Sequence, residues 1–404
     1  MIPQPSASAR ELLAGAESFL PWLVEIRRDL HQHPELGLEE FRTAAKVAER
    51  LDELGIEHRD GLGGTGILGL IPGDPAGPVV ALRADLDALP LQDHKDVPYR
   101  STIPGRMHAC GHDVHTAILL GAARLLAERR ARLGRLPGTV KLLFQPAEET
   151  VGGARLLIAA GVLEDPKVDR IFGLHVDAGL PVGQVGVRYG QRNASSDNLT
   201  IVVHGRSAHG AYPSPGVDAI VAAAQVVSAL QTVVSRNVDG RDAAVVTVGT
   251  IHGGTQGNIV ANRVELVGTV RCLDPKIREL VLRRVREVAE GVAGGFGARA
   301  EVTIEPSYDP LVNHDLAVDE VRAAAMDLLG PAAVQLVPRP NMGVEDFGFY
   351  LSHVPGAFSS LGVRNEERGI VHPVHHELFD ADERALAIGA ALQVRCALEV
   401  WGAE

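Results

Sequence analysis

Apolar and polar positions repeat with two different periods along the chain. Apolar residues recur about every 3.6 positions over residues 11–30 and again over 40–54, which predicts two amphipathic helices. Gly55 follows the second segment, where a helix commonly ends. The apolar run GPVVALRADLDALP predicts a buried strand that ends near Asp85 and Asp87, and TAILLGAARLLAERRARLG predicts a long helix that begins just after a cluster of histidines. Strands that alternate with helices predict an α/β domain with a mostly parallel sheet.

Acidic or imidazole side chains lie at the ends of three of the predicted strands. Asp85 and Asp87 end the first run, Glu148 and Glu149 follow VKLLF, and His175 lies in GLHV. In open α/β sheets, functional sites gather beyond the carboxyl ends of the strands. We therefore expect these three segments to meet at one place.

The pattern changes near residue 186, where alternating β-branched strands replace the long apolar runs. Four strands and two helices, at 217–235 and 275–291, follow one another in the order β-α-β-β-α-β, which is the split βαβ arrangement. The chain then returns to mixed α/β segments. We therefore predict an inserted α+β domain at 186–302 and a first domain formed by 1–185 and 303–404.

Composition narrows the class of protein. The 404 residues are 46% hydrophobic and 22% charged, as in a globular protein with a large core. The net charge of −12 and the lack of a basic block argue against nucleic acid or an anionic membrane as a partner. The sequence has no run of about 18 apolar residues and no secretory signal pattern at its start, so we expect no membrane span and a cytoplasmic location.

The stretch MHACGHDVH, residues 107–115, carries three histidines and one of the three cysteines of the chain. Such residues near a helix start are usually caps or small buried side chains. Cys110 and His112 differ, because Gly111 lets the backbone turn between them and a helix start favours a thiolate. Two chemical interpretations stay open at this point: a thiol nucleophile with a histidine base, or a metal site. Three isolated cysteines indicate no disulfide framework.

The pair Glu148–Glu149 favours the metal site. A solvated surface turn would also explain two adjacent carboxylates, but burying them at a strand end requires a nearby cation. One carboxylate can then bind a divalent ion while the other accepts a proton from water. Together with Cys110, His112, His175 and a histidine of HPVHHELF, these donors suit Zn²⁺ and also Mn²⁺, Co²⁺ or Ni²⁺. They exceed what one tetrahedral ion uses, so we expect two divalent ions.

Several motifs, in order along the chain, resemble one enzyme family. They are HQHPELGLEEFRTA, ALRADLDALPLQ, MHACGHDVHTAILLGAA, VKLLFQPAEE, GGARLLIAAGVLED, GLHV and MGVEDFGFYLSHVPGAFSSLG. They span nearly the whole chain and resemble the metal-dependent amidohydrolases of the aminoacylase/carboxypeptidase superfamily, in the branch of hippurate hydrolases, auxin-conjugate hydrolases and N-acyl-amino-acid amidohydrolases. The resemblance implies a dinuclear metallopeptidase catalytic domain with an inserted domain that serves as lid and dimer interface.

The resemblance also implies roles for residues of the first domain. The metal ligands would be Cys110, His112, Glu149, His175 and His375. Glu148 would be the general base and Asp87 an acid that orients a ligand, whereas Asp85 is a candidate for substrate contact. Residues around the last ligand depart from the family pattern, because Glu377 stands where proline is usual. The choice of His375 over its neighbouring histidines, His372 and His376, therefore rests on its spacing to Phe379.

Three residues of the inserted domain gain roles in the same way. The segment GRSAHGAYPSPGVDAI resembles one whose histidine stabilises the oxyanion, often across a dimer interface, and it places His209 there. The loop GGTQGNIVAN makes Asn258 a candidate for binding the oxyanion or the substrate carboxylate. Arg271 in GTVRCLD is a further candidate for substrate binding. Two alternatives stay open, because a histidine that caps a turn and an arginine that is exposed to solvent on a strand would show the same sequence patterns.

The expected activity is hydrolysis of the amide bond of N-acyl amino acids, by a homodimer or a tetramer built from dimers. An exopeptidase that acts on short peptides would use the same residues. A non-catalytic binding protein would be expected to lack Glu148 or several ligands, and all of them are present. A hydrolase with Cys110 as nucleophile would keep its activity in a metal chelator, whereas a metal enzyme would lose it.

Overall fold

The computed structural model describes residues 5–403 and divides into two compact units. Unit 1 comprises residues up to Gly190 together with Asn313–Pro338 and the segment from Phe349 onward, and unit 2 comprises Gln191–Val312 and Arg339–Gly348. Each unit has its own cluster of buried apolar side chains. Both segments of unit 2 therefore lie between segments of unit 1 along the chain, so unit 2 is an insertion in the sequence of unit 1.

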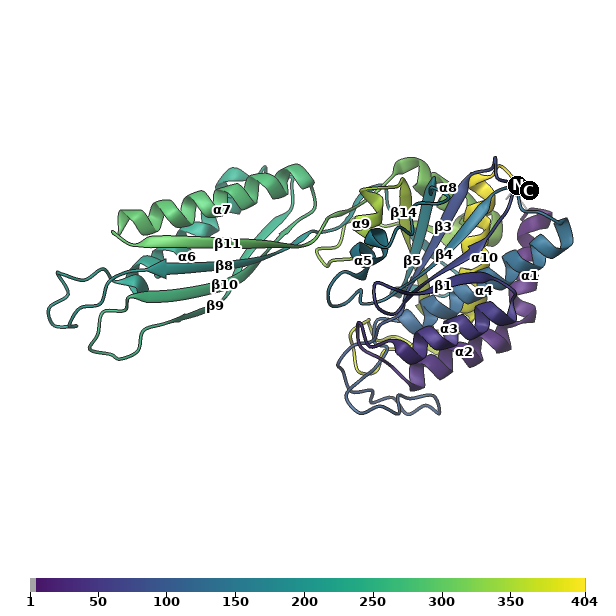
Figure 1. Ribbon diagram of the computed structural model, residues 1–404, viewed down its shortest axis with the longest axis horizontal. Helices are drawn as coiled ribbons and strands as arrows, with labels where there is room; N and C mark the ends of the chain where they lie inside the picture. Colours follow the sequence, from purple (N-terminus) through teal and green to yellow (C-terminus); the bar gives the residue numbers. More distant parts are fainter. Residues whose placement is uncertain (1–4, 404) are drawn as a thin grey trace. The chain divides into compact units, whose positions relative to one another are not determined.

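Unit 1 is built on an eight-stranded sheet (Figure 1) with the strand order β1-β2-β4-β3-β5-β14-β6-β13. Its strands are β1 (Glu57–Leu62), β2 (Gly66–Ile71), β3 (Val79–Asp85), β4 (Thr139–Gln145), β5 (Arg170–Pro181), β6 (Val185–Val187), β13 (Val334–Leu336) and β14 (Gly356–Arg364). The four central strands, β4, β3, β5 and β14, run parallel. All residues of β3 and β4 are buried, as expected for parallel strands covered on both faces.

Helices of unit 1 cover this sheet. They are α1 (Ala7–Ser18), α2 (Leu20–Gln32), α3 (Phe41–Glu53), α4 (His112–Leu133), α5 (Gly153–Ala159), α8 (Asp315–Leu329), α9 (Phe347–Leu351, at the edge of the unit) and α10 (Arg384–Val400), with short 3₁₀ turns η1 (Pro331–Ala333) and η2 (Glu366–Arg368). Helices α4 and α10 pack on the central strands and on each other, and α2 packs on both helices. The mixed α/β fold with a mostly parallel sheet confirms the predicted fold class.

The N-terminal helical segment differs from its prediction. One helix was expected over 11–30, whereas the chain forms α1 and α2 with a break at Phe19. Proline at the second position of α2 explains the break, because it lacks the N–H that a continuous helix would need. The apolar period continues across the break, so the sequence pattern did not reveal it.

Unit 2 contains a four-stranded antiparallel sheet with the order β11-β8-β10-β9 (Figure 1). Its elements are β8 (Ser196–His204), α6 (Ala219–Asn237), β9 (Ala244–Gly253), β10 (Arg263–Cys272), α7 (Pro275–Gly295) and β11 (Arg299–Tyr308). Their order along the chain is the predicted β-α-β-β-α-β. Both helices pack on the sheet over the buried cluster of the unit. Two further short strands, β7 (Gly190–Asn193) and β12 (Leu311–Asn313), pair with each other.

Helix α6 is the one helix, within residues 5–403, that is long and apolar enough to cross a membrane by length and composition. One third (33%) of its apolar window is buried inside the structure. Its buried residues, including Ala222, Val226 and Leu230, face the sheet of unit 2. Core helices of globular domains reach the same length and hydropathy, so this feature does not by itself indicate a membrane.

Candidate metal centre

Asp87 lies just beyond β3 and organises two other segments of unit 1. Its carboxylate accepts hydrogen bonds from the backbone N–H groups of Glu148, at 3.1 Å, and Glu149, at 3.0 Å. The same carboxylate lies 3.2 Å from Nδ1 of His112. A carboxylate at Nδ1 fixes the proton there and leaves the lone pair of Nε2 free for a ligand role. Nε2 of His112 is buried and has no hydrogen-bond partner within residues 5–403.

The five residues expected to bind metal lie together. Sγ of Cys110 is 3.2 Å from Nε2 of His175 and 3.3 Å from Nε2 of His375. Nε2 of His375 is in turn 3.0 Å from a carboxylate oxygen of Glu149. Among these residues and Glu148, potential ligand atoms fall within 4.8 Å of one another in three overlapping groups: Cys110–His112–His175, Cys110–Glu149–His375 and His112–Glu148–Glu149. Unit 1 thus gathers the predicted donors from four separate segments.

The charges in this cluster fit a divalent cation. Burial, together with Glu149 and Glu148, raises the pKa of the Cys110 thiol well above its usual value. Burial would lower the pKa of His112, but the neighbouring carboxylates, Asp85 first and then Asp87, raise it to about 10. Both shifts reflect surplus negative charge in a buried place, which a bound cation would neutralise.

Asp85 is engaged inside the protein. Its two oxygens lie 2.6 Å from Nδ1 of His115 and 2.5 Å from Nη1 of Arg83, and the residue is fully buried. Nε2 of His115 accepts a hydrogen bond from the N–H of Val176 at 2.9 Å. This chain of contacts fixes the middle of β5 next to His175. The prediction that His175 lies at a strand end is wrong, because β5 continues to Pro181. The buried carboxylate therefore fits a positioning role and leaves no exposed oxygen for the substrate contact expected from sequence.

Backbone geometry explains how the ligands of the MHACGHDVH stretch converge. Gly111 has φ +87°, and a Cβ at this position would lie 2.4 Å from Cγ2 of Val176. Glycine is therefore required by both conformation and space. Helix α4 begins at His112, inside the cluster and not after it, because the turn at Gly111 already provides the helix start. His112 and Asp113 accordingly occupy its first turn.

Residues assigned to the inserted domain by sequence lie in unit 2. His209 and Asn258 are exposed and lie on adjacent loops, where Gly210 N–H donates to the carbonyl of Asn258 at 2.7 Å. Nδ1 of His209 accepts a hydrogen bond from Ala211 N–H at 3.1 Å, so the ring proton of the neutral imidazole lies on Nε2. Arg271 is half-buried, and burial lowers its pKa.

The sequence prediction missed the partners of Asp85. His115 was counted only among the histidines of MHACGHDVH, and Arg83 was not considered. A usable signal existed, because Arg83 interrupts the otherwise apolar run VVALRAD. An arginine in a fully buried strand must be paired with a carboxylate, and Asp85 two residues later lies on the same face of the strand.

Comparison with known proteins identifies the family. The profile described as Peptidase family M20/M25/M40 matches residues 81–399. The chain belongs to this peptidase family. It is 42% identical to an N-acetylcysteine deacetylase of Bacillus subtilis over 375 residues, which is 93% of this chain and 95% of that protein. It is 38% identical to thermostable carboxypeptidase 2 of Saccharolobus solfataricus over 382 residues, 94% of this chain and 95% of that protein.

A solved M20 structure supports the same conclusion. A Bacillus subtilis protein described as a dinuclear metal binding peptidase from the M20 family matches with a TM-score of 0.84 and 38% identity, over 96% of this chain and 99% of that one. The resemblance to metal-dependent amidohydrolases is therefore confirmed at family level, and the chain is an M20 hydrolase with a dinuclear metal-binding fold.

Proposed function

We propose that the chain hydrolyses the amide bond of N-acyl amino acids and releases a carboxylic acid and a free amino acid. The observation that carries this proposal is the position of the Glu148–Glu149 pair. Both backbone N–H groups are fixed by Asp87, and both carboxylates lie within 4.8 Å of a donor atom of His112. This position supports one carboxylate as a metal ligand and the other as the group that moves a proton.

Two divalent ions would be held by Cys110, His112, Glu149, His175 and His375. The donor set of one thiolate, three imidazoles and one carboxylate fits Zn²⁺, Mn²⁺, Co²⁺ or Ni²⁺. When bound, such ions polarise the substrate carbonyl and make water more acidic. Nε2 of His112, which has no hydrogen-bond partner among the described residues and lies 3.7 Å from an Asp85 oxygen, and the surplus negative charge around Cys110 support this occupancy.

Glu148 would carry the proton during the reaction. The carboxylate accepts a proton from the attacking water, whose oxygen forms a bond to the carbonyl carbon. The C–N bond then breaks, and Glu148 returns the proton to the leaving nitrogen. Burial of Glu148, which is 6% exposed, keeps this carboxylate out of bulk solvent. No covalent bond to the protein is formed, so Cys110 is not needed as a nucleophile.

Unit 2 would supply His209 and Asn258 to the oxyanion and Arg271 to the substrate carboxylate. The loops of His209 and Asn258 adjoin the end of the sheet where Arg263 pairs with His204. Arg271 lies eight positions further along β10, about 27 Å away at the usual rise of a strand. This distance exceeds the length of an N-acyl amino acid. Within one chain, these groups therefore cannot all contact one substrate molecule.

We infer that a second copy of the chain supplies His209 and Asn258. Strand β9 is an edge of the sheet of unit 2, and an unpaired edge can pair with another chain. Apolar side chains are exposed on this strand and on neighbouring segments: Ile220 and Val221 on α6, Val245 and Ile251 on β9, and Ile259 in the loop of Asn258. This combination supports a homodimer formed through unit 2.

The competing activity is cleavage of short peptides, since one of the similar proteins is named a carboxypeptidase. A panel of substrates, varied separately in the acyl group and in the amino acid, would be assayed beside dipeptides with metal-reconstituted enzyme. The expected result is turnover of N-acyl amino acids that is lost with a chelator and restored by Mn²⁺ or Zn²⁺. Turnover of dipeptides alone would favour the exopeptidase, and activity that survives chelation would overturn the metal mechanism.

A further inference from the structure

The guanidinium of Arg27 on α2 is completely buried in unit 1 and joins two distant segments. Nε donates to Asp113 at 2.9 Å, and Nη2 donates to Asp380 at 2.6 Å. Nη1 lies 3.3 Å from Glu383. One side chain thus ties the first turn of α4 to the segment that follows His375.

Both segments carry a predicted metal ligand. Asp113 directly follows His112, and Asp380 lies five residues beyond His375. The segments are tied a second time by the N–H of His375, which donates to the carbonyl of Ala109 at 2.8 Å. Their mutual position is therefore fixed at two points, by one backbone hydrogen bond and by the guanidinium of Arg27.

His375 needs such support because its backbone is strained. Its φ of +62° lies in the left-handed region, which is unfavourable for any residue with a side chain. Residues in this region persist only where the surroundings hold them. The imidazole of His375 is also about half exposed, so packing alone does not fix it. The contact of Arg27 with Asp380 restrains the chain on the C-terminal side of this strained residue.

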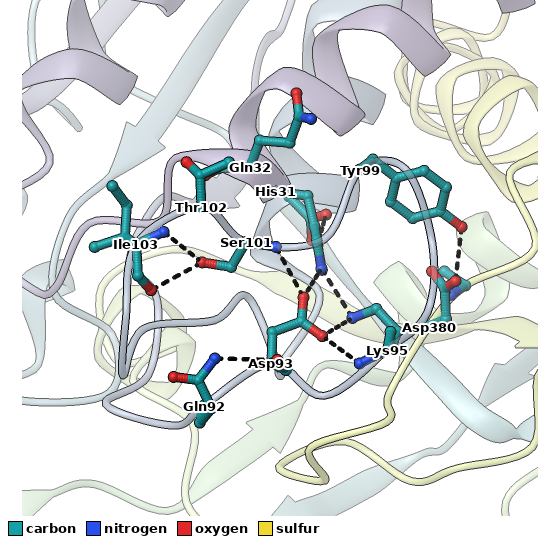
Figure 2. A network of polar contacts seen from close by, with 12 residues as sticks. His31, Gln32, Gln92, Asp93, Lys95, Tyr99, Ser101, Thr102, Ile103 and Asp380 are labelled. Atoms are coloured by element: carbon teal, nitrogen blue, oxygen red, sulfur yellow. Dashed lines mark hydrogen bonds and ion pairs between the residues drawn. The ribbon is translucent and has the colours of Figure 1, made fainter.

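A second layer of side chains holds the same two carboxylates (Figure 2). The Asp113 oxygen that binds Arg27 also accepts a hydrogen bond from Nδ1 of His31, at 2.7 Å. Nζ of Lys95 lies 2.9 Å from the other ring nitrogen of His31, and the hydroxyl of Tyr99 donates to Asp380 at 2.7 Å. Lys95 and Tyr99 belong to the loop between β3 and α4. The loop thereby adds contacts to the groups that Arg27 binds, and the guanidinium of Arg27 lies 4.8 Å from the centre of the Tyr99 ring.

This buried ion cluster is not explained by packing. Burial would lower the pKa of Arg27, yet the carboxylates of Asp380 and Asp113 raise it well above its usual value, so the group stays charged. Apolar side chains of similar size often fill such a space with equal or greater stability. A charged cluster at this place is therefore better explained by the segments that it connects than by the stability that it adds.

We propose that Arg27 is a positioning residue of the metal centre, which holds the segments of His112 and His375 at the separation needed to bind the same pair of ions. The inference rests on the proposed function, because it takes both histidines to be metal ligands. It adds a residue on α2 that contacts neither metal nor substrate.

The test uses the full chain with Arg27→Met and Arg27→Lys, and Arg28→Met as the matched control. Arg28 is the neighbour of Arg27 and binds Glu383 at 2.8 Å, but it contacts neither Asp113 nor Asp380 in the described residues. Affinity for Mn²⁺ is measured on metal-free protein by competition with a fluorescent chelator. The thiolate-to-metal absorbance of the Co²⁺-loaded protein reports the geometry around Cys110, and thermal unfolding of metal-free protein shows whether each variant is folded.

Arg27→Met is expected to weaken Mn²⁺ affinity about 10- to 100-fold and to alter the Co²⁺ spectrum, as for other residues that support metal ligands. Arg27→Lys should lose less of the affinity for Mn²⁺ than Arg27→Met does. The Mn²⁺ affinity of Arg28→Met should stay within about twofold of the native value. If Arg27→Met does not fold, Asp380→Asn replaces it, with a smaller loss expected. Unchanged affinity and spectrum in folded variants would overturn the inference alone. Absence of Mn²⁺ binding by the native chain would overturn the proposed function as well.

Discussion

Glu148 in unit 1 and His209 in unit 2 are proposed to act on the same amide, yet their surroundings are opposite. Glu148 is buried, its backbone is fixed by Asp87, and the neighbouring ligands are held by charged contacts. His209 is exposed on a loop and its ring nitrogen accepts one local hydrogen bond. The proposed groups of unit 1 are therefore held by several internal contacts, whereas His209 of unit 2 is held by few.

This contrast predicts which substitutions can change activity without changing the stability of the fold. Substitutions of the proposed metal ligands in unit 1, and of the charged groups that hold them, remove partners from buried charges, so they affect metal binding and stability together. Substitutions at exposed loop residues of unit 2 remove a contact to substrate and leave the free energy of unfolding nearly unchanged. The following predictions test the contrast, from the largest expected effect to the smallest.

Glu148→Gln should lower kcat about 10²- to 10⁴-fold while metal content stays native, because the amide keeps the shape but cannot accept the proton. Steady-state kinetics and metal analysis check both parts. Glu149→Gln is the matched control, since this neighbour shares the contact with Asp87 but is expected to lose metal. A Glu148→Gln enzyme that keeps more than a few per cent of native activity would contradict the role of general base.

His209→Ala should lower kcat about 10²-fold, as loss of one oxyanion donor does, without changing thermal unfolding or metal content. His204→Ala, at a partly exposed histidine of the same unit, should leave kcat unchanged. Mixing His209→Ala with Glu148→Gln chains should restore roughly a quarter of native activity, because half of the dimers would carry one intact site of two. No recovery in mixed dimers would show that His209 acts within its own chain.

Asp87→Asn should weaken metal affinity about 10- to 100-fold, since His112 loses the carboxylate at Nδ1 and the Glu148–Glu149 turn loses half of its charge-assisted hydrogen bonds. Chelator competition with Mn²⁺ measures the change. Asp197→Asn is the control, because Asp197 pairs with Arg278 in unit 2. This substitution should leave the affinity for Mn²⁺ unchanged. An effect at both positions would indicate general destabilisation in place of ligand orientation.

Acid should unfold unit 1 before unit 2. The pKa of Asp93 in unit 1 lies below its usual value: burial opposes this shift, and hydrogen bonds from His31 and from backbone N–H groups outweigh burial. The pKa of Asp382 is lowered to about 2 by Arg384 and Asn365 against the effect of burial. A carboxyl with a depressed folded pKa stabilises the fold above its unfolded pKa of about 3.9, and this stability is lost as pH falls through the folded value. Hydrogen exchange measured between about pH 4 and 2 should show unit 1 opening first.

Asp93→Asn should lower the free energy of unfolding by about 1–3 kcal/mol at pH 7, by removing a charged partner from buried groups. The difference in free energy of unfolding between the variant and the native chain should shrink on acidification, because Asp93 of the native chain then also loses its negative charge. Urea unfolding at several pH values measures it. Asp239→Asn, an exposed aspartate of unit 2 that pairs with Arg241, should cause no measurable change at any pH. A pH-independent loss at Asp93 would contradict the electrostatic explanation.

Much of the architecture follows from local pattern. The buried run before Asp85 became β3 and the apolar run before Glu148 became β4. The segments of unit 2 follow one another along the chain in the predicted order, and their alternating strands form one antiparallel sheet. The break at Phe19 was not predictable, because the 3.6-residue period continues across it. The predicted helix begins at Thr116, four residues after α4 begins at His112. The first turn of α4 contains polar residues, so the apolar period that predicts a helix is not visible there.

The sequence by itself determined the types of side chain available for chemistry and the order of the strands that carry them, since both are properties of short segments. Only the tertiary structure decided which distant groups meet. It paired Asp85 with His115, 30 residues away, and it placed Arg27 between Asp113 and Asp380, 86 and 353 residues away. Contacts over such separations depend on the path of the whole chain, whereas a sequence period reports only what neighbouring residues share.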